Sequence, residues 1–215
     1  MRSSLLSAVL VALVLMPMAV HAQCNQPGTV HISAGANLGI HATKYQETTP
    51  QYSNSDRDGA ISYGFPLKVH VGVLKPLSIG VYGEFGGYVD TAGTRSNRTG
   101  VIGIEPRFYP VNTDYFNLRL FMQGGYSMLR IEDRYQFAQV GVARYAGPHF
   151  AFGTGLGFYA KKVFGMYFDL KYVRHWLPLR SFEANGHEVD FDAFNYEAKL
   201  TTGGIQLELG FNVRF

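Results

Sequence analysis

The feature that most constrains this 215-residue chain is a regular alternation of apolar residues with polar or small ones, which recurs in eight separate segments. In the first segment Val30, Ile32 and Ala34 are apolar, and His31 and Ser33 lie between them. A period of two predicts β-strands, because successive side chains of a strand point to opposite faces. The eight segments cover residues 30–42, 61–73, 77–86, 102–108, 118–127, 150–158, 166–176 and 205–215.

Eight alternating segments are typical of a membrane-spanning β-barrel, although a soluble β-sandwich also alternates. The connections between the segments distinguish the two folds. Long polar connections are expected at 43–59, 132–147 and 178–200, and short turns at 74–76 and 161–163. Long loops at one end and short turns at the other are the rule for membrane barrels. We therefore predict an all-β, eight-stranded, antiparallel up-and-down transmembrane β-barrel.

Aromatic residues on the apolar face support the membrane interpretation, because aromatic girdles form where a barrel meets the lipid headgroups. Hydrophobic residues make up 47% of the chain and charged residues 16%, and the mean hydropathy is −0.03. A mean hydropathy near zero results when apolar residues on one face of each strand alternate with polar residues on the other, because the two contributions cancel. The expected outer girdle comprises Tyr63, Phe65, Tyr126, Tyr172 and Trp176, and the inner girdle comprises Phe108, Phe158, Phe164 and Phe215.

Charge and cysteine content exclude several classes of protein. The formal net charge is +3 and the basic residues are spread along the chain, so no nucleic-acid partner is expected. A single cysteine excludes a disulfide-bonded scaffold and a cysteine-based zinc site.

The polar face of the predicted strands carries four positive and four negative residues. An eight-stranded barrel is only wide enough for its own side chains to fill, so these charges must pair inside it. Glycines at 153, 155 and 157 would make room for the longer side chains. We predict a salt-bridged, closed lumen rather than an open channel. The eight residues of this predicted luminal charge network are Lys68, Glu84, Glu105, Arg107, Arg119, Asp169, Lys171 and Glu208.

Counting along the strands predicts the positions of some of these residues relative to one another. The short turn at 74–76 places Lys68 opposite or diagonal to Glu84. The next connection places Glu84 beside Glu105 and diagonal to Arg107. Lys171 is expected near Glu208 in the same way.

The first 22 residues predict a cleavable secretory signal peptide, with Arg2 followed by an apolar run and cleavage after Ala22. The alternative, an uncleaved anchor helix, is disfavoured because the run is too short to span a membrane. The mature barrel domain would then be 23–215. Cys24 lies close to the cut, but Gln23 before it does not fit a lipoprotein signal, so a free, exposed and inert thiol is expected.

The last segment ends on a terminal phenylalanine, with apolar residues at alternate positions before it. Leu209, Phe211, Val213 and Phe215 resemble the C-terminal assembly signal of bacterial outer-membrane proteins. With the signal peptide and the eight segments, the chain resembles the OmpA/OmpX-like small outer-membrane β-barrel family. That resemblance implies a Gram-negative source, a cell outer membrane location with periplasmic termini, contacts with outer-membrane lipids and lipopolysaccharide, and insertion by the outer-membrane assembly machinery.

No arrangement of residues predicts an active site. His31 and His70 are expected to lie nearly opposite each other, but a metal site needs at least one further ligand. The His-x-Ser pair of barrel-type lipid A deacylases is absent at His175, which points inward by parity. Ser181, His187 and Asp190 supply the residue types of a palmitoyltransferase-like site without a diagnostic spacing. We expect no catalytic, cofactor-binding or metal-binding residues.

The remaining functional candidates are the outer loops near 43–59, 132–147 and 178–200, which could bind a protein partner. The alternation within 188–200 suggests that the last strand starts early and stands above the membrane. The favoured hypothesis is a non-enzymatic, envelope-structural or surface-interaction protein. The alternatives are an outer-leaflet lipid A-modifying enzyme and a small solute channel.

Overall fold

The computed structural model describes residues 23–89, 95–134, 140–160, 163–190 and 195–215. The proposed signal peptide, 1–22, lies outside these ranges, so its cleavage stays a prediction. None of the described segments is a helix long and apolar enough to cross a membrane. The strands are β1 (Val30–Thr48), β2 (Ser53–Leu74), β3 (Leu77–Tyr88), β4 (Arg95–Asn112), β5 (Phe116–Arg134), β6 (Val140–Tyr159), β7 (Phe164–Ala184), β8 (His187–Glu188) and β9 (Glu197–Arg214).

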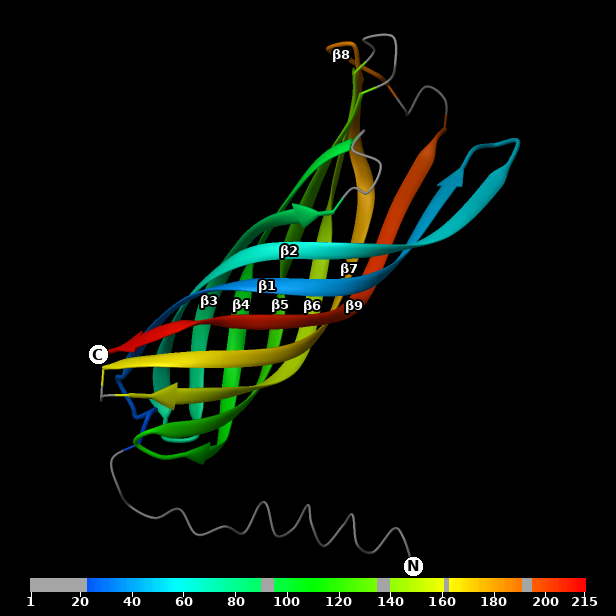
Figure 1. Ribbon diagram of the computed structural model, residues 1–215. Coiled ribbons are helices and arrows are strands. Elements are labelled where there is room, and N and C mark those ends of the chain that lie inside the picture. The colour runs from blue at the N-terminus through cyan, green and yellow to red at the C-terminus, as the bar shows by residue number, and fades with distance from the viewer. Residues whose placement is uncertain (1–22, 90–94, 135–139, 161–162, 191–194) are drawn as a thin grey trace, which may run out of the picture.

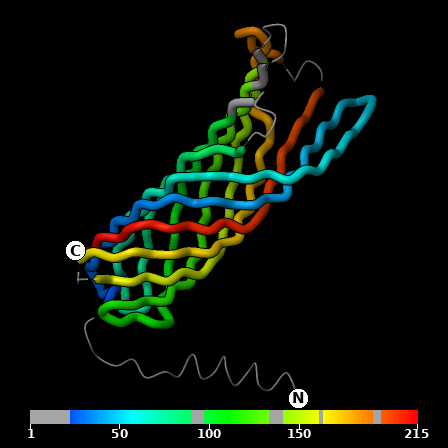
Figure 2. Tube along the Cα trace, viewed as in Figure 1, coloured from blue at the N-terminus to red at the C-terminus, as the bar shows by residue number. Residues whose placement is uncertain are grey.

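Eight of these strands close into a barrel, as predicted. Each is antiparallel to both of its neighbours, and the ring closes where β9 pairs with β1 on one side and with β7 on the other. The short β8 folds back on the end of β7, with which it pairs only at Glu183 and Ala184, and it lies outside the ring. Figures 1 and 2 show the tilted strands winding around one central axis. Closure leaves no unpaired sheet edge in the body of the barrel, which a bilayer requires.

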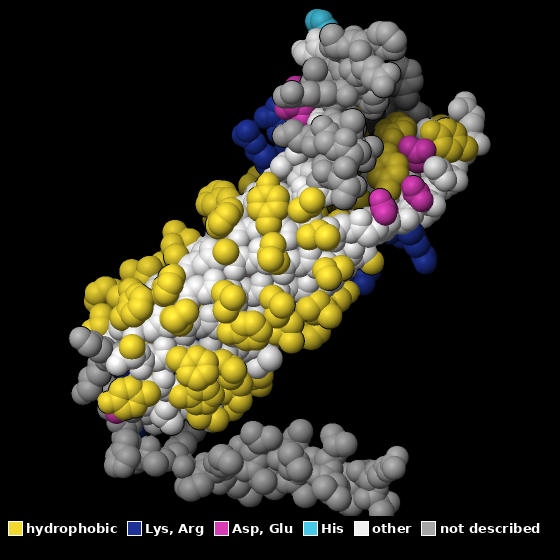
Figure 3. All heavy atoms as spheres, in the orientation of Figure 1, with side chains coloured by type: hydrophobic (Ala, Val, Ile, Leu, Met, Phe, Trp, Pro, Cys, Tyr) yellow, Lys and Arg dark blue, Asp and Glu magenta, His cyan; other side chains and the backbone are white. Residues whose placement is uncertain are grey.

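The outer surface of the barrel body is apolar and the inner surface is polar. On β7, Met166 and Leu170 are 54% and 41% exposed, whereas Asp169 and Lys171 between and beside them are buried. Figure 3 shows the resulting cover of hydrophobic side chains on the face of the barrel body that is turned to the viewer, and the exposed apolar residues of this belt come from all eight strands of the ring. Exposed apolar surface of this extent has lipid, not water, as its solvent. All the aromatic residues of the two predicted girdles except the half-buried Trp176 are exposed on this surface.

The strands are longer at one end than the sequence pattern indicates. We call this the outer end, and the opposite end, where Phe215 lies, the inner end. The predicted loops at 43–59 and 132–147 are mostly strand, because β1 and β2 leave only 49–52 between them and β5 runs on to Arg134. β9 begins at Glu197, so its early start is confirmed, and β7 continues to Ala184. Cross-strand hydrogen bonds continue here although the apolar alternation that marked the strands has ended.

Residues Gln23–Gly28 lie across the inner end and contact the turns there. The Asn25 side-chain amide donates hydrogen bonds to the carbonyl oxygens of Leu74, Lys75 and Leu77, at 2.8, 3.1 and 3.2 Å. Cys24 is fully buried, and its Sγ donates to the Asp114 carbonyl at 3.4 Å. The expectation of an exposed thiol is therefore wrong, because the segment before β1 folds back against the β4–β5 turn.

Candidate functional site: a closed, ion-paired lumen

The structure brings all eight residues of the luminal charge network together inside the barrel. They come from six strands: β2, β3, β4, β5, β7 and β9. Their inward direction follows from the period of two, since each alternates with lipid-facing apolar neighbours. Seven of the side chains are at most 2% exposed, and Glu84 is 13% exposed.

Lys68 lies at the centre of the network. Its Nζ is 2.6 Å from Glu208 Oε1, 3.3 Å from Asp169 Oδ2 and 3.6 Å from Glu105 Oε2. The rings of Phe121 and Tyr167 lie 5.6 and 5.5 Å from the same Nζ. An ammonium group held by three carboxylates and two aromatic faces is compensated without water, which is the condition for a buried charge to be tolerated.

Two arginines complete the inner half of the network. Arg107 Nε lies 2.5 Å from Glu105 Oε1. Arg119 donates to Asp169 Oδ1 through both Nε, at 3.0 Å, and Nη2, at 2.6 Å. Towards the outer end, Lys171 Nζ lies 3.2 Å from both Glu84 Oε2 and Glu208 Oε2. Each of the four cations therefore has a carboxylate partner within the lumen.

The register confirms some of the predicted positions and corrects others. Lys171 pairs with Glu208, and His31 lies directly opposite His70, as predicted. Lys68 is diagonal to Glu84, since Pro66 is the residue opposite Glu84, but the two form no ion pair. The placement of Glu84 beside Glu105 is wrong, because Glu105 lies opposite Gly80.

Arg107 is likewise misplaced by the count, since it lies opposite Ser78 and not diagonal to Glu84. The prediction requires Glu84 to lie opposite Glu105. In the structure Gly86 pairs with Thr99 and Glu84 with Val101, so the residue opposite Glu84 comes four positions earlier on β4 than predicted. In addition, the partner of Glu84 comes from across the lumen, on β7. In a narrow barrel, a charged side chain can form an ion pair with a residue across the lumen as well as with a residue on a neighbouring strand.

Small residues on β6 provide the space that the network occupies. A Cβ placed on Gly155 would meet the Asp169 carboxylate and lie 2.9 Å from Arg119 Nε. A Cβ on Gly153 would lie 2.7 Å from the Phe121 ring, and one on Gly157 would lie 2.7 Å from Asn117. These glycines face the interior, as predicted. A larger residue would displace Asp169 or Arg119 at Gly155, Phe121 at Gly153, and the polar Asn117 at Gly157.

An apolar cluster fills the barrel interior at the outer end, and the sequence reasoning missed it. Leu129, Tyr145 and Leu177 are 3%, 8% and 2% exposed and contact one another. Partly buried hydrophobic residues surround them: Tyr88, Ile131, Ala143, Leu179 and Leu200. This outer cluster could have been predicted from the positions of the apolar residues on β5 and β7. In the barrel body these residues are mostly even-numbered and face outward, but beyond Ser127 and His175 odd-numbered apolar residues face inward.

Three buried histidines lie in the lumen between the charge network and the outer cluster. The rings of His149 and His175 are 4.5 Å apart, and His41 contacts Tyr88 edge-on. His175 points inward, as predicted, with 6% exposure. The described residues contain no group of three or more His, Cys, Asp or Glu side chains placed to hold a metal ion.

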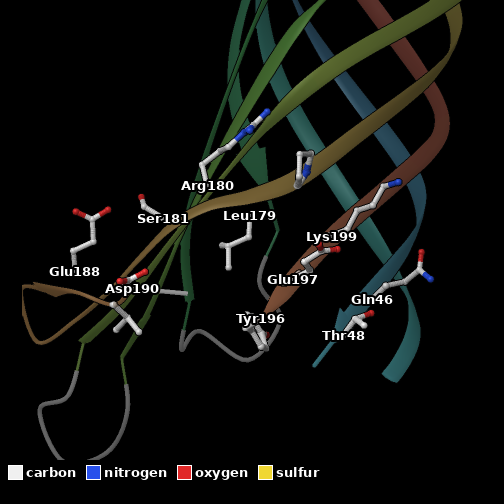
Figure 4. A pocket seen from close by; sticks show the side chains of 13 residues that line it. Gln46, Thr48, Leu179, Arg180, Ser181, Glu188, Asp190, Tyr196, Glu197 and Lys199 are labelled. Atoms are coloured by element: carbon white, nitrogen blue, oxygen red, sulfur yellow. The ribbon is translucent and has the colours of Figure 1, made fainter. Parts of the chain in front are cut away.

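A cleft of about 760 Å³ opens at the outer end between β7, β9 and the end of β1. Figure 4 shows Ser181 and Asp190 on one side and Gln46 and Thr48 on the other. His187 is not among the lining residues, and Ser181 Oγ accepts a hydrogen bond from Arg144 at 3.4 Å. The residues considered for a palmitoyltransferase-like site are therefore not assembled into a Ser–His–Asp arrangement.

Comparison with known proteins identifies the fold. No family model and no curated protein sequence matches the chain. The outer membrane protein OprG from Pseudomonas aeruginosa is similar in structure, with a TM-score of 0.58 and 11% identity over 89% of this chain and 97% of that one. Ail of Yersinia pestis (TM-score 0.43, 16% identity, 88% and 100% covered) and the outer membrane protease OmpT from Escherichia coli (0.45, 10%, 93% and 100%) also match.

The similarity to OprG confirms the fold of small outer-membrane β-barrels. Together with the lipid-facing belt and the closed ring of strands, this fold places the chain in the outer membrane.

Proposed function

We propose that this outer-membrane barrel is a non-enzymatic protein with a closed lumen, which serves in the cell envelope as a structural element or as a support for surface interactions. The observation that carries the proposal is that the interior is obstructed at three successive levels. Gln23–Gly28 covers the inner end, the luminal charge network fills the middle, and the outer cluster fills the outer end.

This arrangement argues against a solute channel. Each level is held by contacts that a passing solute would have to break, namely buried hydrogen bonds, ion pairs and apolar packing. The purified protein in planar bilayers is expected to give no conductance above leak. Discrete, sustained single-channel openings would contradict the closed lumen.

The two outer protrusions are the proposed contact surfaces. One is the β1–β2 hairpin, and the other is formed by β5, β6 and β7 with β8 at its tip (Figure 1). The hairpin is held in register by pairs that extend to Thr48 and Ser53. Ordered strands present a fixed surface to a partner at a lower entropic cost than flexible loops would.

A hairpin truncation separates the structural role from the interaction role. Replacing residues 44–57 by an Asn-Gly turn between Thr43 and Asp58 should leave the barrel folded, as judged by heat-modifiable gel migration. If the role is structural, cells with the truncated protein keep the detergent resistance of the wild type. If the role is surface interaction, the truncation removes adhesion or aggregation that depends on the full-length protein. If deleting the whole gene changes neither property, the proposal fails.

The lipid A-modifying alternative is tested separately. Mass spectra of lipid A from cells with and without the protein are expected to show the same acyl chains and phosphate groups. A change in acyl count that depends on the protein would contradict the non-enzymatic proposal and would direct attention to the cleft around Ser181 and Asp190.

A further inference from the structure

Three arginines on adjacent strands lie directly beside one another on the outside of the barrel. Arg98 of β4 is opposite Arg130 of β5, and Arg130 is in turn opposite Arg144 of β6. Arg98 is exposed, and the side chains of Arg130 and Arg144 are 49% and 43% exposed. We call these three residues the arginine row.

Such a row is electrostatically unfavourable for the barrel by itself. Like charges directly opposite each other on neighbouring strands destabilise a sheet. Adjacent strands are about 4.8 Å apart, so the three positions span only about 10 Å. The row would gain most from an anion with several oxygen atoms placed against it.

The carboxylates near the row lie on its far side from the membrane. Glu132 Oε2 is 3.6 Å from Arg130 Nη2, and Glu183 forms an ion pair with Arg144. Glu132 follows Arg130 on β5, and Glu183 lies beyond Ser181, the residue opposite Arg144 on β7. Both acids are therefore further towards the outer tips. Among the described residues, the positions in register on the side of the row that faces the lipid belt are Gly100, Met128 and Ala146, and none of these carries a carboxylate.

The surface between the row and the membrane begins with two small residues beside a methionine and continues with larger apolar residues. The next outward-facing positions, about 7 Å along the strands towards the membrane, are Gly100, Met128 and Ala146, again in register across the three strands. A Cβ added to Gly100 would meet only Met128 Cε, at 3.8 Å, so the surface beside it is open. The positions below these are Ile102, Tyr126 and Pro148, which belong to the lipid-facing belt.

We propose that the arginine row binds the phosphate groups of an anionic glycolipid of the outer leaflet, with the acyl chains of that lipid lying against the apolar surface below. The row stands at the upper margin of the belt, where Figure 3 also shows Lys and Arg side chains, and headgroup phosphates are found at that level. Guanidinium groups bind phosphate oxygens through paired hydrogen bonds. The inference goes beyond the proposed function, since it assigns a lipid site to the wall of the barrel whether or not the protrusions bind a partner.

The test compares one lipid with and without its phosphates. Diphosphoryl lipid A and the same lipid A after enzymatic dephosphorylation are added to the full-length mature protein in detergent micelles, and bound lipid is measured by native mass spectrometry. The wild type should prefer the diphosphoryl form. The triple variant Arg98→Gln, Arg130→Gln, Arg144→Gln should lose about fivefold in affinity for each arginine, or about 100-fold in total.

A matched control removes the same charge elsewhere on the outer end: Lys44→Gln, Arg57→Gln, Lys199→Gln. This control should keep most of the preference for phosphate, and heat-modifiable migration checks that both variants are folded. Arg→Lys at the three row positions should restore binding in part, because charge returns without the paired hydrogen bonds.

Three results would overturn the proposal. The first is an equal loss of binding in the row variant and in the control, which would mean general attraction to a cationic surface. The second is equal binding of the dephosphorylated lipid by the wild type. The third is displacement of lipid A by inorganic phosphate at the same concentration, which would mean a site for soluble anions.

Discussion

The barrel body and its outer extension use the same strands with opposite distributions of polarity. On β5, Gln123 and Ser127 point inward within the barrel body, while Met122 and Met128 face outward. Beyond that level Leu129 becomes the inward residue, and the outward positions are occupied by charged side chains.

The same inversion occurs on β7 and β9. Inward Asp169 on β7 is succeeded by inward Leu177, and inward Glu208 on β9 is preceded by inward Leu200. The cross-strand pairing continues through the change without a break on β9. The surrounding solvent, lipid below and water above, therefore decides which face is apolar, because burying apolar surface is favourable only where water is the alternative.

The largest effect is expected from breaking the interior of the barrel body. Lys68→Met leaves Glu208, Asp169 and Glu105 without their shared cation, and it should lower the free energy of unfolding by about 3–5 kcal/mol. Urea unfolding in detergent, followed by Trp176 fluorescence, measures this. The lipid-facing neighbour Val69→Met should change stability by less than about 1.5 kcal/mol, and equal losses in the two variants would show that the network does not stabilise the barrel.

The interior of the outer extension should behave like the core of a soluble protein. Leu177→Ala is expected to cost about 3 kcal/mol, because it removes apolar contacts with Leu129 and Tyr145 and leaves a cavity. Leu207→Ala, on the lipid-facing surface of β9, should cost less, since lipid occupies the space. Equal costs in the same unfolding assay would mean that the outer cluster is not a packed core.

The outer surfaces of the two regions should differ in their tolerance of charge. Leu207→Arg places a guanidinium against lipid and is expected to cost about 2 kcal/mol, whereas Thr201→Arg, further out on the same face of β9, should cost about 0–1 kcal/mol. If the two costs match, the boundary between lipid and water does not lie between these residues.

The contrast also explains how much could be predicted from the sequence. The period of two is regular in the barrel body, so the inward direction of Lys68, Asp169 and Glu208 follows from their alternation with apolar residues. Their ion pairs cannot be predicted in this way. Lys68 on β2 contacts Asp169 on β7 across the lumen, and the distance between these strands depends on the cross-section of the closed barrel. The outer parts of β1 and β2 lack alternating apolar residues, so the sequence predicts a loop there, while their backbone still pairs.

The smallest effect is expected at the inner end, where the closure depends on hydrogen bonds rather than on charge or packing. Asn25→Ala removes three side-chain hydrogen bonds to the β2–β3 turn and should cost about 1–2 kcal/mol. Cys24 reports this locally, because burial raises the pKa of its thiol and shields it from solvent.

Maleimide should therefore label Cys24 slowly in the folded wild type and several times faster in Asn25→Ala, with Ser78→Ala in the lumen as a control that leaves the rate unchanged. Labelling should also quicken as the pH rises towards the raised thiol pKa, since the thiolate is the reactive form. Fast labelling of the folded wild type would show that Gln23–Gly28 does not cover the inner end in solution. The barrel would then be closed at its middle and outer levels only.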